Sequence, residues 1–290
     1  MLAVVTCFFN PSESANSIAN YFRFRQAIKM VPIFTVEMSF TGHFVIPDSI
    51  RINGCLETQV LWQKERILNH GISYIPDCFD QIAWLDCDLL FTNPDWPAIT
   101  EKLLEAFPVV QLFEQCHWLN QYCEIEKSRP SSASLGSYFQ TGTDKSHPGF
   151  AWAARREQIS QWGGLFDQDI TGSGDAWMTH AFFSEFETSM AREASPKLRN
   201  AALNWCQRVS STTGGKVGVV AGAVLHLYHG DLQERKYWER FLLLKEHNYD
   251  PNADIEIAEN GAWKWASSKI DLHHDVRKQF GNIGNFNETQ

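Results

Sequence analysis

The sequence predicts an α/β fold with a central, mainly parallel sheet and helices on both of its faces. Short apolar runs alternate with longer amphipathic stretches through residues 1–113. Turn residues such as Asn10-Pro11 end the apolar runs. Alternation of this kind is typical of a parallel sheet built from strand–helix–strand units. Ligands of such sheets bind beyond the carboxyl ends of the strands, so the polar residues at those ends are the first candidates for a site.

Each element follows from its own pattern of apolar residues. Strands are expected where the run is short and apolar, and helices where apolar residues recur on one helical face. The expected strands are residues 2–9, 31–40, 48–52, 81–86, 108–113, 149–154 and 216–230. The expected helices are residues 12–30, 58–71 (with Gly71 as C-cap), 93–107 (with Asp95 as cap), 155–162, 175–186, 195–211 and 232–248. Residues 114–146 are polar and contain "SRPSSASLGS", so a flexible loop is expected there.

Composition narrows the function classes. The chain of 290 residues carries 34 acidic and 25 basic residues, a net charge of −9, which argues against tight non-specific binding of nucleic acid. Seven Cys with no CxxC pair fit a reducing compartment. The N-terminal stretch "MLAVVTCFFNP" has no basic region and no cleavage site, so it is expected to be a strand and not a signal peptide. No run is long enough for a membrane span, and a cytoplasmic location is expected.

Two carboxylates follow the apolar strand "QIAWL", at Asp86 and Asp88. In extended backbone, positions i and i+2 face the same side. Two converging carboxylates repel each other unless a cation lies between them, and hard oxygen ligands suit Mg²⁺ or Mn²⁺ shared with a phosphate-bearing substrate. The alternative is that one Asp caps the following turn and the other is solvated.

Further motifs come downstream of this pair. Residues 147–178 read "HPGFAWAARREQISQWGGLFDQDITGSGDAWM", and residues 226–230 read "HLYHG". These motifs follow Asp86-Cys87-Asp88 in the order typical of one enzyme class. Residues 1–250 therefore resemble the GT-A class of nucleotide-sugar-dependent glycosyltransferases. Residues 147–178 look most like the galactosyltransferase-type branch, which has Gly-Gly-Glu-Asp where this chain has Gly-Ser-Gly-Asp at 172–175.

The resemblance implies a GT-A fold and a division of the chain. Residues 1–113 would be the nucleotide-binding half of one catalytic domain, and residues 147–250 the acceptor and catalytic half. Residues 251–290 would be a C-terminal extension. The implied cofactors are Mn²⁺ or Mg²⁺ and a nucleotide-sugar donor, with a UDP-sugar favoured.

The resemblance also implies the metal ligands. Asp88 would bind the metal directly, and Asp86 would reach it through water or contact the donor ribose. A late histidine completes the metal site in this class, and here His226 and His229 compete for that position. In a strict strand these two, at i and i+3, would face opposite sides, so one ligand is expected.

Asp175 would be the catalytic base. It follows two glycines at the expected start of a helix, where plain N-capping is the alternative. By resemblance, its carboxylate would take the proton of the acceptor hydroxyl as that oxygen attacks the anomeric carbon. One base and in-line attack imply inversion at that carbon.

Residues for the donor come from the strand ends. Gly149 would let the backbone approach the donor sugar, with a strand bulge as the alternative. Thr6, Phe8 and Asn10 end the first strand, where the resemblance places the base and ribose of the nucleotide.

Three further polar residues could also reach the donor. Glu37 ends the second strand and could contact the ribose or base, and Lys64 and Asn69 could face the diphosphate or base from the helix before the metal strand. For each of them, a solvated surface position is the alternative. The 11 Trp and 20 Phe indicate an aromatic-rich core, with the alternative that a few rings stack on flat or carbohydrate ligands.

The function expected from these residues is a metal-dependent, inverting glycosyltransferase with a hydroxyl acceptor, a glycan being favoured. A glycosyltransferase of phage type that acts on modified DNA bases is an alternative. A nucleotidyltransferase is another, although "TCFFNPSES" lacks the basic phosphate loop which that class places after strand one. A carbohydrate-binding protein that lost its chemistry is the third. The oligomeric state is left open.

Overall fold

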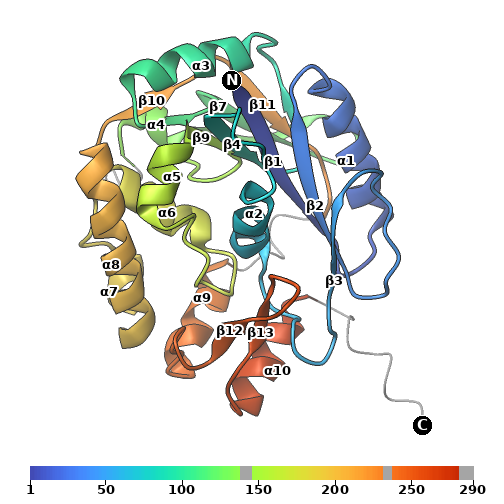
Figure 1. The fold of residues 1–290 in the computed structure, drawn as a ribbon, viewed down its shortest axis with the longest axis vertical. Coiled ribbons are helices and arrows are strands. Elements are labelled where there is room, and N and C mark those ends of the chain that lie inside the picture. Colours follow the sequence, from blue (N-terminus) through green and yellow to red (C-terminus); the bar gives the residue numbers. More distant parts are fainter. Residues whose placement is uncertain (138–145, 231–236, 281–290) are drawn as a thin grey trace.

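The computed structural model describes residues 1–137, 146–230 and 237–280. Its main sheet has seven strands in the order β10-β6-β9-β4-β1-β2-β3 (Figure 1). Every neighbouring pair is parallel except those of β9, which runs antiparallel to β4 and β6. The predicted α/β class with a mainly parallel sheet is confirmed. These strands are β1 (Leu2–Phe9), β2 (Ile33–Ser39), β3 (Ile50–Asn53), β4 (Gln81–Leu85), β6 (Val109–Gln111), β9 (Ala151–Arg155) and β10 (Val217–Val219).

Successive residues of the central strands enter two different cores. On β4, Ile82 and Trp84 pack in one apolar cluster while Ala83 and Leu85 pack in the other. Because side chains alternate along a strand, the two clusters lie on opposite faces of the sheet. A sheet covered on both faces needs apolar residues at nearly every position, as these strands have.

Helices cover both faces of the main sheet (Figure 1). One cluster takes residues of α1 and α3, and the other takes residues of α2, α5, α6, α8 and α9. The helices are α1 (Ala15–Ala27), α2 (Lys64–Ile72), α3 (Trp96–Ala106), α4 (Ser132–Leu135), α5 (Arg156–Trp162), α6 (Gly174–Phe182), α7 (Ser189–Glu193), α8 (Pro196–Thr213), α9 (Tyr237–Glu246) and α10 (Ile270–Lys278). In the described residues, no helix is long and apolar enough to cross a membrane.

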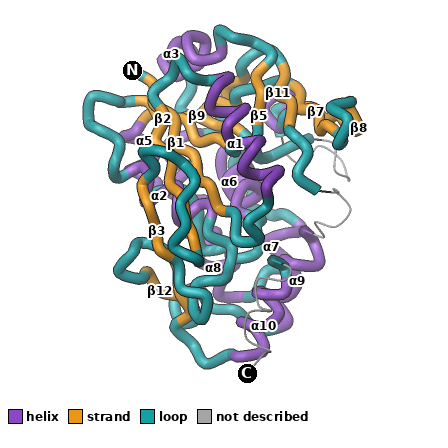
Figure 2. Tube along the Cα trace, turned by 90° about the vertical axis from the view of Figure 1, so that its right-hand side faces the viewer, coloured by secondary structure: helices purple, strands orange, loops and turns teal. Residues whose placement is uncertain are grey.

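A second sheet carries part of the site. It has the order β5-β11-β7-β8 and lies beside α1 at one end of the molecule (Figure 2). Its strands are β5 (Leu89–Phe91), β7 (Gln115–Leu119), β8 (Ile125–Pro130) and β11 (Ala223–His226). A two-stranded sheet of β12 (Ile255–Ile257) and β13 (Trp263–Trp265) stands near α10 (Figure 1).

The structure differs from the expectation in several segments. Residues 115–130 form a hairpin where a loop is expected, because an edge strand such as β8 exposes charged residues and shows no apolar alternation. The expected strand 216–230 is two strands in different sheets. Helix α2 starts at Lys64 and runs through Gly71, which is not the C-cap: a Cβ there would lie 2.6 Å from Val36 Cγ2, so close packing on β2 explains the glycine.

Candidate active site

A pocket of about 930 Å³ opens at the carboxyl ends of β1 and β4, the edge at which parallel sheets bind their ligands. Its volume is in the range of natural small-molecule sites. The lining comes from residues 7–12, Trp62, Lys64, residues 86–88, residues 147–150, Gly172, Ser173, Asp175, Ala176, His226, His229 and residues 238–241, among others. Every predicted metal ligand and the predicted base line this one pocket.

The two carboxylates after β4 turn to different partners. Strand β4 ends at Leu85, and residues 86–88 form a turn before β5. Asp86 binds Lys64, whereas Asp88 lies beside two histidines. The two carboxylates line the same pocket but do not converge on one partner, because the backbone turns at residues 87–88 and is not extended through Asp88.

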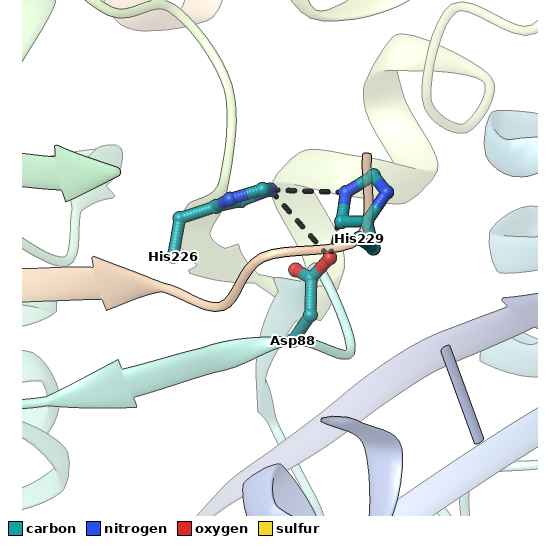
Figure 3. A group of neighbouring side chains, drawn as sticks. All are labelled: Asp88, His226 and His229. Atoms are coloured by element: carbon teal, nitrogen blue, oxygen red, sulfur yellow. Dashed lines mark hydrogen bonds and ion pairs between the residues drawn. The ribbon is translucent and has the colours of Figure 1, made fainter. Parts of the chain in front are cut away.

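Asp88, His226 and His229 form a cluster that can hold a metal ion. Asp88 Oδ2 lies 3.5 Å from His226 Nε2 and 3.2 Å from His229 Nε2, and the two Nε2 atoms are 3.3 Å apart. One ligand atom from each residue lies within 4.8 Å of the others. Asp88 stands in the turn before β5, His226 ends β11, and His229 lies in the segment that follows it (Figure 3).

Both histidines reach the cluster because β11 stops at His226. The expectation that His226 and His229 face opposite sides assumed a strand through residue 230, but the strand ends at His226 and the chain bends at residues 229–230. The Leu227 amide donates to the Asp88 carbonyl at 3.0 Å, which fixes the two segments side by side. The structure thus brings together Asp88 and both candidate histidines, while Asp86 lies outside this group.

The His226 ring is held by aromatic packing. It stacks on Phe150 with a centroid distance of 4.8 Å and an interplanar angle of 17°. Phe150 has a φ of +77°, a left-handed conformation that costs a bulky residue energy and is found most often at functional sites. Its carbonyl accepts the Asp86 amide at 2.8 Å. Phe150 therefore links the backbone after β4 to the imidazole that faces Asp88.

The ligand atoms of the cluster fit a divalent metal that binds both oxygen and nitrogen. Carboxylate oxygen suits Mg²⁺ and Mn²⁺, while imidazole nitrogen suits transition metals. Two imidazoles and one carboxylate therefore favour Mn²⁺ over Mg²⁺. The cluster lines an open pocket, so water or substrate oxygens could fill the remaining coordination positions.

A second charged group lies in the same pocket. Lys64 Nζ is 2.6 Å from Asp86 Oδ1 and 2.9 Å from Asp175 Oδ2. Burial lowers the pKa of Lys64, but the carboxylates of Asp175, Asp86 and Glu65 more than offset this and hold it well above its usual value. Burial raises the pKa of Asp86 to about 6, with Lys64 acting against the shift. The ammonium of Lys64 thus joins the turn after β4 to the start of α6.

Asp175 reaches Lys64 because Gly149 makes room for its carboxylate. Ser173 is the N-cap residue of α6, so Asp175 is not the cap and its carboxylate turns into the pocket. A Cβ on Gly149 would lie 2.5 Å from Asp175 Oδ2, a distance that no side chain can occupy. Gly149 therefore makes space for the carboxylate of Asp175.

Sequence reasoning missed Trp62, which lines the pocket, and Glu65, which is buried behind it. Burial raises the pKa of Glu65 to about 8, and its Oε2 accepts the indole N–H of Trp62 at 3.0 Å. A Cβ on Gly174 would lie 2.6 Å from Glu65 Cδ. The signal available in the sequence was the spacing: Trp62 and Glu65 stand three residues apart beside Lys64.

Phe8 and Asn10 line the pocket as expected of the end of β1. The Asn10 amide also binds the backbone of Ser14, donating to its carbonyl at 3.1 Å and accepting from its N–H at 3.0 Å. Asn10 thus fixes the loop between β1 and α1.

Glu37 does not line the pocket. Its carboxylate is buried and accepts from the amides of Val45 and Ile46, at 2.7 and 3.1 Å, and from Ser49 Oγ at 2.9 Å. Three donors from one loop use both of its oxygens, so Glu37 folds that loop against β2.

Thr6 and Asn69 also bind the protein's own backbone. Thr6 Oγ1 is buried and donates to the Leu85 carbonyl at 2.7 Å. The Asn69 amide accepts from the Leu165 N–H at 2.8 Å and donates to the Leu165 carbonyl at 2.9 Å. Neither lines the pocket, because each ties a strand or helix to a neighbouring segment.

Comparisons with known proteins give low similarities. No family model and no curated protein matches the chain. Among solved structures, a Drosophila beta1,4-galactosyltransferase 7 mutant in complex with manganese, UDP-Gal and xylobiose matches at 12% identity and a TM-score of 0.45, over 94% of this chain and 98% of that one.

Two bacterial structures match similarly. Glucosyl-3-phosphoglycerate synthase from Mycobacterium tuberculosis with Mn²⁺, UDP and phosphoglyceric acid has 13% identity and a TM-score of 0.42, over 88% of this chain and 81% of that one. S. aureus TarS in complex with UDP-GlcNAc has 9% identity and a TM-score of 0.41, over 97% of this chain and 72% of that one.

Proposed function

We propose that the protein is a metal-dependent glycosyltransferase of the GT-A class that moves a sugar from a nucleotide-sugar, with UDP favoured, to a hydroxyl acceptor. The observation that carries this proposal is the metal-ligand cluster of Asp88, His226 and His229 in one pocket with the Lys64–Asp86–Asp175 group. The resemblance of the motifs supports it.

The metal would be held by Asp88, His226 and His229. When bound, a divalent cation neutralises the charge that builds on a departing diphosphate. Phe8 and Asn10 line the pocket where the nucleoside is expected. Lys64 places a positive charge between Asp86 and Asp175, close to where the leaving phosphates and the acceptor must meet.

Asp175 is the proposed base. Its carboxylate takes the proton from the acceptor hydroxyl as that oxygen attacks the anomeric carbon from the face opposite the leaving group. A single base and in-line attack lead to inversion, which is part of the proposal. Asp86 is proposed to reach the metal through a water molecule or to contact the donor ribose. Lys64 holds the Asp86 side chain in place.

The alternatives predict different reactions. A nucleotidyltransferase would need positive charge in the loop after β1, and residues 7–14 contain no Lys or Arg. A binding protein would release no nucleotide. The donor set of two histidines and one carboxylate also binds Fe²⁺ in oxygenases, but that chemistry gives no role to the Lys64–Asp86–Asp175 group.

The test is the release of nucleoside diphosphate from a panel of nucleotide-sugars with Mn²⁺. Release should require the metal, stop with EDTA, and fall at least about a hundredfold in Asp88→Asn, because a direct ligand matters more than the outer-shell partners that already cost 10–100-fold. Asp95→Asn is the matched control, since Asp95 lies on the surface before α3 and makes no side-chain cap bond. Equal release by Asp88→Asn and wild type would refute the proposal.

A further inference from the structure

Trp62 lines the pocket that also contains the proposed base. The residue stands in the segment before α2, lines the pocket and is partly exposed to it. Its ring packs against Gly172, where a Cβ would lie 3.4 Å from Cδ2 and Cε2. Gly172 belongs to the same glycine-containing turn that presents Asp175.

The orientation of the Trp62 ring is fixed from two further directions. The indole N–H donates to Glu65 Oε2 at 3.0 Å, and Glu65 is only 2% exposed. The backbone N–H of Trp62 donates to the Ile170 carbonyl at 3.2 Å. A polar edge that is already satisfied leaves the apolar ring as the surface that Trp62 offers to a ligand.

We propose that Trp62 is the platform on which a pyranoside acceptor stacks, so that one of its hydroxyls lies at Asp175. This rests on the proposed function and names the acceptor class. The C–H groups of a pyranose carry partial positive charge and pack on the electron-rich face of an aromatic ring. Carboxylates are strong acceptors for the hydroxyls at the rim of the same sugar.

The position of Trp62 assigns it to the acceptor and not to the donor. Its contacts are with Ile170 and Gly172, on the segment that carries the base, and Lys64 joins that segment to the turn after β4. The metal cluster stands at the end of β11. A group stacked on Trp62 therefore lies on the base side of the pocket, where the attacking hydroxyl must be.

A nucleobase is the rival occupant of an aromatic platform. The pyranoside is favoured because the chain has a net charge of −9 and because the Asp175 carboxylate, which lines the same pocket as Trp62, can accept from a sugar hydroxyl. A DNA acceptor would have to bring its phosphates to this surface, where neutralisation by basic groups is needed.

The experiment measures acceptor kinetics and binding in the full chain with Mn²⁺. The acceptors are methyl glycosides of the common pyranoses and, separately, a duplex that contains 5-hydroxymethylcytosine. Trp62→Ala should raise the KM for the active methyl glycoside about tenfold or more, with a smaller effect on the donor KM, and Trp62→Phe should keep the acceptor KM within about threefold of wild type. Tyr74→Ala is the control, because Tyr74 is an exposed ring outside the pocket lining.

A second measurement needs no truncation of the ring. In protein labelled with 5-fluorotryptophan, the ¹⁹F signal that Trp62→Phe removes should shift when the glycoside saturates the site. A shift confined to another pocket ring such as Trp238 would overturn the inference, as would an unchanged acceptor KM in Trp62→Ala or transfer to the duplex alone. Absence of metal-dependent donor turnover in wild type would instead refute the proposed function, so the two failures are distinguishable.

Discussion

Glu65 is a buried carboxyl group that the sequence alone did not identify. Burial is the main cause that raises its pKa from 4.5 to about 8; Lys64 acts against the shift, while Asp175 and Asp169 add to it. At a pH between 4.5 and about 8, Glu65 is protonated in the folded protein and ionised in the unfolded chain. Stability contributed by this group is therefore present below about pH 4.5 and is lost as the pH rises toward 8.

Glu65→Gln should remove this pH dependence. The free energy of unfolding of the variant, relative to wild type, should increase between pH 5 and pH 8 by about 1–3 kcal/mol, because Gln cannot ionise but can still accept from the Trp62 indole. Urea denaturation at several pH values measures it. Glu105→Gln, on an exposed side of α3, is the control, and a variant-to-wild-type difference that stays constant with pH would contradict the assignment.

Gly149 tests the placement of the proposed base. Gly149→Ala puts a methyl group where Asp175 Oδ2 now lies, 2.5 Å from the ideal Cβ. We expect the carboxylate to move away from Lys64 and transfer to fall at least about a hundredfold, since misplacement of catalytic groups by 1 Å costs about that much. Metal binding at Asp88, His226 and His229 should remain.

The control for that variant is Gly136→Ala, where a Cβ meets no atom within 4 Å and only the positive φ of the residue opposes the change. Activity of Gly149→Ala equal to that of Gly136→Ala would show that the position of Asp175 does not matter for transfer.

At the residue scale, the type and order of side chains pointed to residues that the structure brings together in one pocket. The Asp86-Cys87-Asp88 pair and the late histidines were selected by type and order, and the structure brings Asp88, His226 and His229 together. Glu37 and Asn69 could not be judged in the same way, because a polar side chain at a strand or helix end can serve a ligand or a nearby backbone, and only the fold decides between them.

At the scale of elements, strand ends control the site. Strand β11 stops at His226, and this break brings His229 to Asp88 as well. The sequence "HLYHG" does not reveal the break, since its residues are compatible with a longer strand. Hairpin β7–β8 was missed for a related reason: Glu126, Lys127 and Ser128 are exposed, so no apolar periodicity marks the strand.

The C-terminal segment supplies part of the main core. Ile255, Trp263, Leu272 and Val276 belong to the same buried cluster as Trp177 of α6. Gln63, directly before α2, binds the backbone of Trp263 in both directions, at 2.8 and 2.9 Å. These contacts join residues 251–280 to the helix that carries Lys64.

A chain that ends at Asp250 should therefore fail to fold cooperatively. Removing one large buried side chain costs about 2–5 kcal/mol, and the loss of several exceeds the 5–15 kcal/mol of a typical domain. Thermal denaturation followed by circular dichroism is the measurement, with a chain that ends at Phe280 as control. A sharp transition near the control's temperature would show that residues 251–290 are a dispensable extension.

At the scale of the whole molecule, the fold class was predictable because the central strands are buried on both faces and read as plain apolar runs. Strands β1, β2, β4 and β6 lie within the segments expected for them. The second sheet was not predictable, because β5 and β11 contribute only three and four residues and pair across distant parts of the chain. Long-range pairing leaves no periodic signal in a single sequence.

The most direct test of the metal site is electron paramagnetic resonance of Mn²⁺ bound to the protein with UDP. We predict hyperfine coupling to ³¹P of the diphosphate, together with ¹⁴N coupling from two imidazoles. His226→Ala and His229→Ala should each remove one nitrogen coupling, and Asp88→Asn should weaken Mn²⁺ binding. Mn²⁺ that binds with neither nitrogen coupling nor ³¹P coupling would contradict the assignment of Asp88, His226 and His229 as the ligands that hold the metal on the donor.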